Sequence, residues 1–188
     1  MGWDINTVTE FKNKSGEYQI AQDYVSEHTV DGYVSYNVIG PVAEYRNYNL
    51  FRVLAGVHNT QKFIDQEKRC WEDYERSNMI HNSITNYYKD KYRGEYWPES
   101  DNPITPVKHT TGMPADANII TKKILEFEHD EDIHYLNLED AKNYVKQNPD
   151  AQQFRLLVDK LKELFAKCKT INPDLQEKDF RMIYGFNY

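Results

Sequence analysis

Imidazole and carboxylate side chains gather in one short stretch of this chain, and they are groups that hold divalent metals in proteins. The stretch runs from His129 to His134 and contains Asp132. The candidate metal ligands are His129, Asp132 and His134, and Asp4 or Asp116 would join them if the fold brings these carboxylates close. Because the spacing matches no strong metal motif, a solvated acidic loop is the alternative, and a divalent metal is not the favoured cofactor.

A second polar group brackets an apolar run, with Arg46, Asn47 and Tyr48 before it and Asn59 after it. An arginine side chain and the backbone amides at a helix start both favour anions, so these residues are candidates for binding a phosphate or a carboxylate. An equally supported alternative is structural, with Arg46 paired to an acid and Asn47 capping the helix. The candidate ligand-binding residues are Arg46, Asn47, Tyr48, Asn59, Asp4, Asp116 and His134.

A helix must position this second group. Its apolar residues, Leu50, Phe51, Leu54 and Val57, recur at the spacing of one helix face. Gly56 suits a C-terminal cap better than a helix interior. The pattern therefore predicts a helix that begins close to Arg46 and ends at about Gly56.

Alternating residues at both ends of the chain predict strands. Residues 3–11 and 180–186 alternate in this way, and we expect them to lie in one small sheet. Residues 18–20 would form a further strand, whereas residues 23–41 show no clear period and predict an irregular connection. The predicted fold class is α+β, in which this sheet packs against several helices within a single domain, residues 1–188.

Helical periodicity accounts for much of the remaining chain. Residues 61–92 predict one long helix or a pair broken near 78–82, and we interpret residues 61–97 as a helical elaboration of the domain. Four prolines mark residues 97–114 as a loop. Further helices are expected over residues 115–127, from Leu138 onward, and from Asn148 to the Asn172-Pro173 pair.

Composition narrows the classes of function. The net charge of -7 disfavours general binding to nucleic-acid phosphates. The two cysteines, Cys70 and Cys168, lie far apart, which is typical of a reducing compartment. No apolar run approaches the roughly 18 residues of a membrane span, and the first residues lack the pattern of a signal peptide. The sequence therefore predicts a cytosolic protein, and it contains neither a serine-hydrolase motif nor a phosphate-binding loop.

The run from Arg46 to Asn59 resembles a signature of a family of uncharacterised small proteins encoded by tailed bacteriophages. That signature reads Arg-Asn-Tyr-x-Leu-Phe-x-x-Leu-Ala-Gly-Val-x-Asn. Further blocks of the family occur here in the same order. They correspond to Trp3-Asp4-Ile5-Asn6, Gly112-Met113-Pro114-Ala115-Asp116, the stretch His129 to His134 before Leu136-Asn137-Leu138, and Arg181-Met182-Ile183-Tyr184-Gly185-Phe186-Asn187.

This chain also departs from the family pattern. Trp3 and Asn6 stand where the family has Cys and His, so a metal or catalytic role of that His would not carry over to this chain. His58 stands where the family has Arg. The connection after Asn59 is much longer than usual, which makes residues 61–92 a candidate surface for a partner or for a homo-oligomer.

The resemblance implies an accessory protein in the cytosol of an infected host cell, with counter-defence as its setting. It would act by binding a host protein or a nucleotide-like ligand. The alternative is an enzyme, a hydrolase or transferase with a phosphate-containing or nucleotide substrate, with or without a metal. The sequence leaves open whether the chain is an enzyme, and it assigns no catalytic residue.

Overall fold

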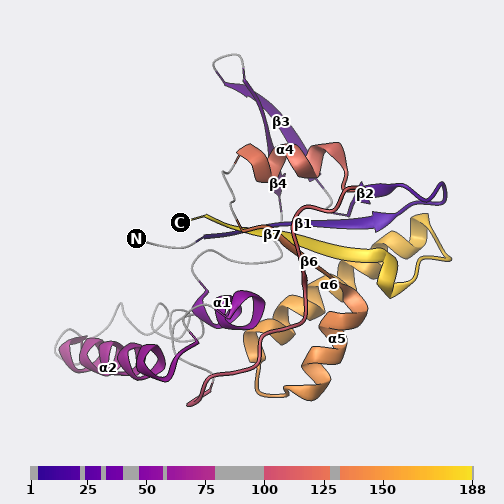
Figure 1. Ribbon diagram of the computed structural model, residues 1–188. Helices are drawn as coiled ribbons and strands as arrows, with labels where there is room; N and C mark the ends of the chain where they lie inside the picture. Colours follow the sequence, from indigo (N-terminus) through magenta and orange to yellow (C-terminus); the bar gives the residue numbers. More distant parts are fainter. Residues whose placement is uncertain are drawn as a thin grey trace. The chain divides into compact units, whose positions relative to one another are not determined.

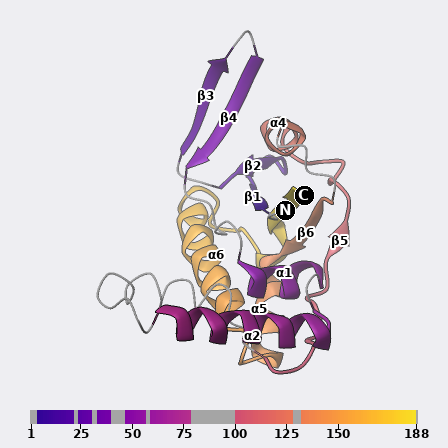
Figure 2. The same ribbon diagram turned by 90° about the vertical axis from the view of Figure 1, so that its left-hand side faces the viewer.

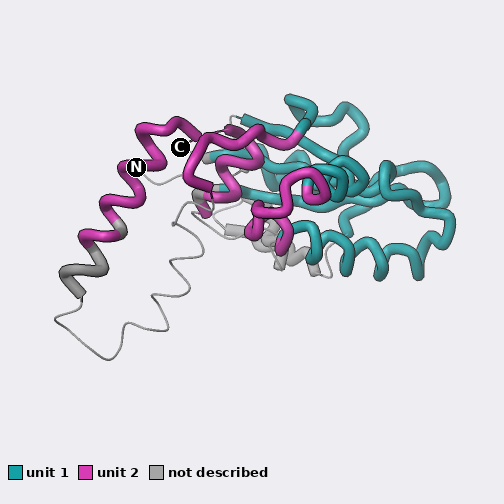
Figure 3. Tube along the Cα trace, turned by 90° about the horizontal axis from the view of Figure 1, so that it is seen from below, with its two compact units in different colours: residues 1–46, 108–144, 157–188 teal, residues 47–107, 145–156 magenta. Residues whose placement is uncertain are grey.

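The computed structural model describes residues 4–21, 24–30, 33–39, 47–56, 59–78, 100–127 and 132–187. The chain forms two compact units, which are coloured separately in Figure 3. Unit 1 consists of residues 1–46, 108–144 and 157–188, and unit 2 of residues 47–107 and 145–156. Each unit is described by itself. The expected single domain stays a prediction.

Unit 1 is built on a five-stranded sheet in which neighbouring strands run antiparallel (Figure 1). The order across the sheet is β2-β1-β7-β6-β5. The strands are β1 (Asp4–Lys12), β2 (Tyr18–Ile20), β5 (Thr110–Thr111), β6 (His134–Asn137) and β7 (Phe180–Asn187). The strands at the two ends of the chain lie side by side. The predicted α+β class and the pairing of the terminal strands in one sheet are confirmed.

The central strand β7 is buried from Phe180 to Phe186, because helices cover both of its faces. On one face, the ring of Phe180 lies 5.4 Å from that of Phe165 in α6 (Gln152–Ile171). On the other, Ile183 packs in a cluster with Leu125 of α4 (Ile119–Phe127). Alternate side chains along a strand point to opposite faces, so the strand is apolar on both sides at its centre.

Residues 24–39 overturn a prediction. The expected irregular connection contains two strands, β3 (Tyr24–Val30) and β4 (Tyr33–Ile39), which pair antiparallel as a separate ribbon (Figure 2). Val30 pairs with Tyr33, which leaves only Asp31-Gly32 between the strands. Asp-Gly flanked by Val, Thr and Tyr is a strong hairpin signal, and the mixture of Ser, Asn and Gly around it conceals the alternation.

Two predicted helix starts lie too early in the sequence. α4 begins at Ile119 because Asn118 caps it, with its side-chain oxygen accepting from the amide of Ile120 at 2.9 Å. α6 begins at Gln152 because Asn148-Pro149-Asp150 forms a turn, in which Asn148 accepts from the amide of Ala151 at 3.2 Å. The predicted end of α6 before Asn172-Pro173 is confirmed. So is the start of α5 (Leu138–Gln147), which Asn137 caps by accepting from the amide of Asp140 at 2.8 Å.

Unit 2 contains the helix at the centre of the sequence signature, α1 (Tyr48–Ala55), and it confirms that prediction. Asn47 caps its start, and Gly56 ends it in the left-handed region with φ 67°. Leu50, Phe51 and Leu54 are buried as expected, but Asn49 and Arg52 are also only 3% exposed. The helix is therefore buried on its polar side as well.

A second helix of unit 2, α2 (Gln61–Asn78), covers the first part of the predicted 61–92 helix. The remainder of that prediction lies outside the described residues. None of the helices in the described ranges is long and apolar enough to cross a lipid bilayer.

Candidate functional site

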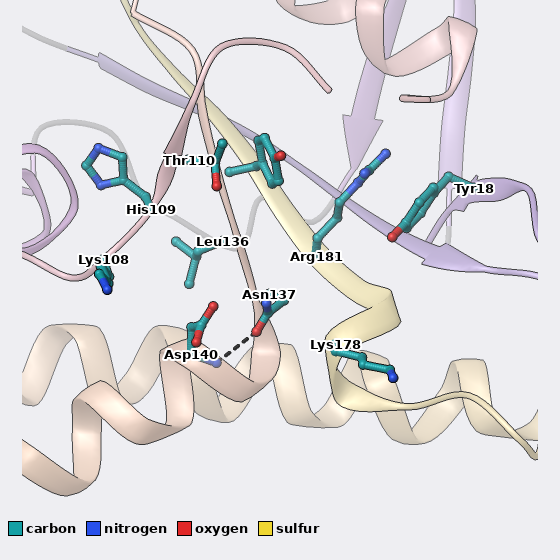
Figure 4. A pocket seen from close by; sticks show the side chains of 10 residues that line it. Tyr18, Lys108, His109, Thr110, Leu136, Asn137, Asp140, Lys178 and Arg181 are labelled. Atoms are coloured by element: carbon teal, nitrogen blue, oxygen red, sulfur yellow. Dashed lines mark hydrogen bonds between the residues drawn. The ribbon is translucent and has the colours of Figure 1, made fainter. Parts of the chain in front are cut away.

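A cavity of about 270 Å³ opens in unit 1, at the edge of the sheet where β6 runs into α5 (Figure 4). Its lining is mostly polar and all of it belongs to unit 1. The lining residues are Tyr18, Lys108, His109, Thr110, Tyr135, Leu136, Asn137, Asp140, Lys178 and Arg181. We call this space the unit 1 cavity.

Strand register assembles one wall of the unit 1 cavity from distant parts of the chain. Asn137 of β6 pairs with Arg181 of β7, and Tyr135 pairs with Thr110 of β5. Paired residues project from the same face of a sheet, and Tyr135 and Asn137 are two apart on one strand. These four side chains therefore share a face, on the side of the sheet that α4 covers over its apolar half.

Arg181 is 6% exposed, and two carboxylates hold its guanidinium. Its Nε and Nη2 donate to one oxygen of Glu10 at 3.0 and 2.8 Å, and its Nη1 donates to Asp116 at 2.8 Å. The guanidinium also lies over the ring of Tyr18, 3.4 Å from the ring centre. Burial by itself lowers the pKa of Arg181, but the hydrogen bonds to Asp116 and Glu10 outweigh burial and raise the pKa above its ordinary value.

Glu10 is fully buried, and it ties three elements together. Besides Arg181 of β7, its carboxylate accepts from the hydroxyl of Thr121 at 2.6 Å and from the amide of Asn118 at 2.8 Å. A buried carboxylate is stable only when its oxygens are satisfied in this way. Glu10 therefore holds Arg181 in place at the edge of the cavity.

Ion pairing distinguishes the two lysines that line the unit 1 cavity from two other lysines of unit 1. Lys12 and Lys142 form ion pairs, with Asp179 and Glu177 respectively. Lys108 and Lys178 are exposed, and neither has an ion-pair partner within the described residues. The lining therefore offers two ammonium groups that form no ion pair within the described residues, together with one acidic side chain, Asp140.

Two histidines meet at one side of the unit 1 cavity. The rings of His109, which lines it, and His134 have their centres 4.3 Å apart. His134 is only 8% exposed, and its Nδ1 has no hydrogen-bond partner in the part of the chain that the structure describes. Burial and then the nearby His109 lower the pKa of His134, which favours the neutral imidazole. The ring of Tyr184 lies 5.6 Å away, and burial raises the pKa of its hydroxyl.

Three of the predicted ligand-binding residues, Asn47, Tyr48 and Asn59, lie in unit 2, and the side chains of the two asparagines bind backbone groups or a neighbouring side chain. Asn47 accepts from the amide of Leu50 at 3.1 Å and donates to Gln153 at 2.9 Å. The side chain of Asn59 forms hydrogen bonds with both backbone groups of Ile104, accepting from its amide at 2.8 Å and donating to its carbonyl. Asn47 thus caps the helix, as the structural alternative predicts. Asn59 likewise holds the backbone in place.

Asp116 and His134 are predicted ligand-binding residues of unit 1. Asp116 binds Arg181, and His134 contacts His109, so each lies one contact away from the lining of the unit 1 cavity. Burial would raise the pKa of Asp116, but its hydrogen bond to Arg181 and that positive charge lower it below the usual range.

The structure describes the remaining candidate residues only in part. Arg46 and His129 fall outside the described residues, and for Asp4 and Tyr48 only the backbone, in β1 and α1, is described. Asp132 is exposed. Among the described residues, no group of three or more His, Cys, Asp or Glu side chains is placed to hold a metal ion. The metal site stays a prediction.

The lining of the unit 1 cavity, as far as the structure describes the chain, contains none of the residues that the sequence singled out as site candidates. Lys108 and His109 precede a two-residue strand, and Lys178 sits in the short 3₁₀ turn η1 (Glu177–Asp179), where no periodicity singles them out. Comparison with known protein families, with curated proteins and with solved structures finds no match.

Proposed function

We propose that this protein is a tailed-bacteriophage accessory protein that works by binding a nucleotide-like, phosphate-bearing small molecule in the unit 1 cavity. The observation that carries the proposal is the pair of lysines, Lys108 and Lys178, that line the cavity without an ion-pair partner in the described residues. A phosphate group would give these two ammonium groups an ionic partner. The cytosol of the host cell and counter-defence are the setting that the phage resemblance implies.

The charges around the unit 1 cavity support an anionic ligand over a neutral one. Arg181 is already neutralised by Glu10 and Asp116, so Lys108 and Lys178 are the groups with charge to offer. Ammonium groups bind phosphate through strong charge-assisted hydrogen bonds. Asn137 adds a polar side chain to the lining.

The size and the aromatic lining of the cavity support a single small molecule with a flat ring. Small-molecule sites occupy roughly 300–1,000 Å³, and the unit 1 cavity, at about 270 Å³, lies just below this range. Tyr135 is half-buried and lines it, and an aromatic ring is a group on which a base can stack. Of the two kinds of partner that the sequence leaves open, these features favour a nucleotide-like ligand over a host protein.

Calorimetric titration with nucleoside 5′-monophosphates and with the matching nucleosides tests the proposal. The phosphates should bind about tenfold or more tightly than the nucleosides, because a phosphate contact by a charged group contributes about 1.5–3 kcal/mol. Lys108→Ala and Lys178→Ala should each weaken binding of the phosphates. Lys160→Ala is the matched control, since Lys160 is an exposed lysine of α6 in unit 1 that does not line the cavity. Equal binding of nucleosides and nucleotides, or no binding of either, would contradict the proposal.

The rival proposal, an enzyme acting on a phosphate-containing substrate, has one observation in its favour. The imidazole of His109 lines the cavity beside Lys108, and histidine is the commonest general acid or base. Incubation with the same nucleotides, followed by ³¹P NMR, would reveal cleavage or transfer. Turnover that His109→Gln abolishes would establish this function, whereas unchanged spectra from the wild-type protein would leave binding alone.

A further inference from the structure

We infer that the ligand of the unit 1 cavity is a guanine mononucleotide, whose base presents its N–H edge to the carboxylate of Asp140. This inference rests on the proposed function and names the chemical class of its ligand. It starts from the one acidic side chain in the lining of a cavity whose other charged lining residues are cations.

Asp140 is held at the cavity by its place in α5. It lies in the first turn of that helix, and its amide donates to the side chain of Asn137, which caps the helix. Figure 4 shows this bond as a dashed line, with the Asp140 side chain rising from the helix toward Leu136. The side chain is exposed and has no ion-pair or hydrogen-bond partner within the described residues. The backbone of Asp140 is therefore fixed at the cavity, and its carboxylate has its accepting capacity available.

An ionised carboxylate only accepts hydrogen bonds, so it repels a ligand that offers nothing but phosphate oxygens. A ligand suited to this cavity needs an anionic part for Lys108 and Lys178 and a donor part for Asp140. Guanine offers two adjacent donors, its ring N–H and its amino group, which match the two oxygens of one carboxylate. Adenine and cytosine place an acceptor nitrogen beside their amino group, and uracil flanks its N–H with carbonyls.

Tyr135 gives the base a surface to lie on. Its ring lines the cavity and is half-buried, and Tyr135 and Asn137 share one face of β6. A base stacked there would lie beside the residue that caps α5, and therefore next to the turn that carries Asp140. The volume of about 270 Å³ suits one nucleotide and no longer oligomer.

Calorimetric titration with GMP, IMP, AMP and ribose 5-phosphate tests the inference. IMP is guanosine monophosphate without the amino group, and ribose 5-phosphate retains the sugar hydroxyls, which a carboxylate can also bind. GMP should bind about tenfold more tightly than the other three, the discrimination typical of one bidentate contact. Asp140→Asn should remove that preference and leave the affinity for ribose 5-phosphate unchanged or higher.

Glu139→Gln is the matched control, because Glu139 is an exposed acid in the same helical turn but does not line the cavity. This variant should keep the preference for GMP. Equal binding of all four phosphates, or equal effects of the two substitutions, would overturn the inference and leave the proposed function standing. Failure of all four to bind would overturn both.

Discussion

The buried pair of Glu10 and Arg181 is the strongest single constraint at the residue scale. Glu10 is fully buried and accepts four hydrogen bonds, from Arg181, Thr121 and Asn118. Removing one charge of such a pair leaves the other desolvated and unpaired. The contact from Asp116 to Arg181 should contribute less to stability, because the Asp116 side chain is 65% exposed.

Glu10→Gln should therefore lower the free energy of unfolding by about 3–5 kcal/mol, measured by urea denaturation. Asp116→Asn removes a contact to the same guanidinium from the solvent side, and it should cost about 1 kcal/mol or less. Losses of similar size in the two variants would contradict the reading that burial gives the Glu10 contact its weight.

His134 adds a pH dependence to stability. Its pKa is lower in the folded protein than in the unfolded chain, so the unfolded chain binds more protons in the window between the two values. Its contribution is thus fully present above about pH 6.5 and is lost as the pH falls toward the folded-state pKa.

His134→Phe retains an aromatic ring against His109 and Tyr184 and removes the titrating group. The variant should lose less stability than the wild-type protein between pH 7.5 and pH 5.5, as measured by the shift in Tm. The same shift in both proteins would show that His134 does not carry this dependence.

The caps of α1 decide its length at the element scale. Gly56 ends the helix at φ 67°, and a Cβ added there would lie 3.0 Å from Cγ of Pro106. Gly16, in the turn between β1 and β2, also has a positive φ of 85°, but a Cβ there would meet no atom within 4 Å. The two glycines thus share the backbone requirement and differ in the space around it.

Gly16→Ala should cost about 1–2 kcal/mol, the penalty of a left-handed residue with a Cβ. Gly56→Ala should cost more, because Pro106 must also give way. Denaturant midpoints of the two variants give the comparison. An equal loss would mean that the backbone conformation alone makes a glycine necessary at Gly56.

At the scale of the whole molecule, the unit 1 cavity lies within one of the two compact units. All of the residues that line it belong to unit 1, whereas Asn59, a candidate ligand-binding residue of the signature, belongs to unit 2 and holds the backbone of Ile104. The signature and the cavity therefore make separate claims about where a ligand binds.

Asn59→Ala distinguishes these claims. It should lower Tm, because two hydrogen bonds to Ile104 are lost and each contributes about 0.5–1.5 kcal/mol. The Kd for GMP should stay at the wild-type value if the ligand binds in the unit 1 cavity. A large rise in this Kd would support Asn59 as a ligand-binding residue.

The sequence by itself determined the local elements. Period-two alternation identified β1 and β7, three-and-four spacing identified α1, and Asn137 marked the start of α5, because each signal acts within a few neighbouring residues. The sequence-based prediction was wrong at the β3–β4 hairpin, because the mixed composition of these residues conceals their alternation.

Only the tertiary structure decided the site. Strand pairing brought Thr110, Tyr135 and Arg181 together, and the hydrogen bonds to Glu10 neutralise Arg181. Such juxtapositions depend on register between segments far apart in the chain, which no local periodicity encodes.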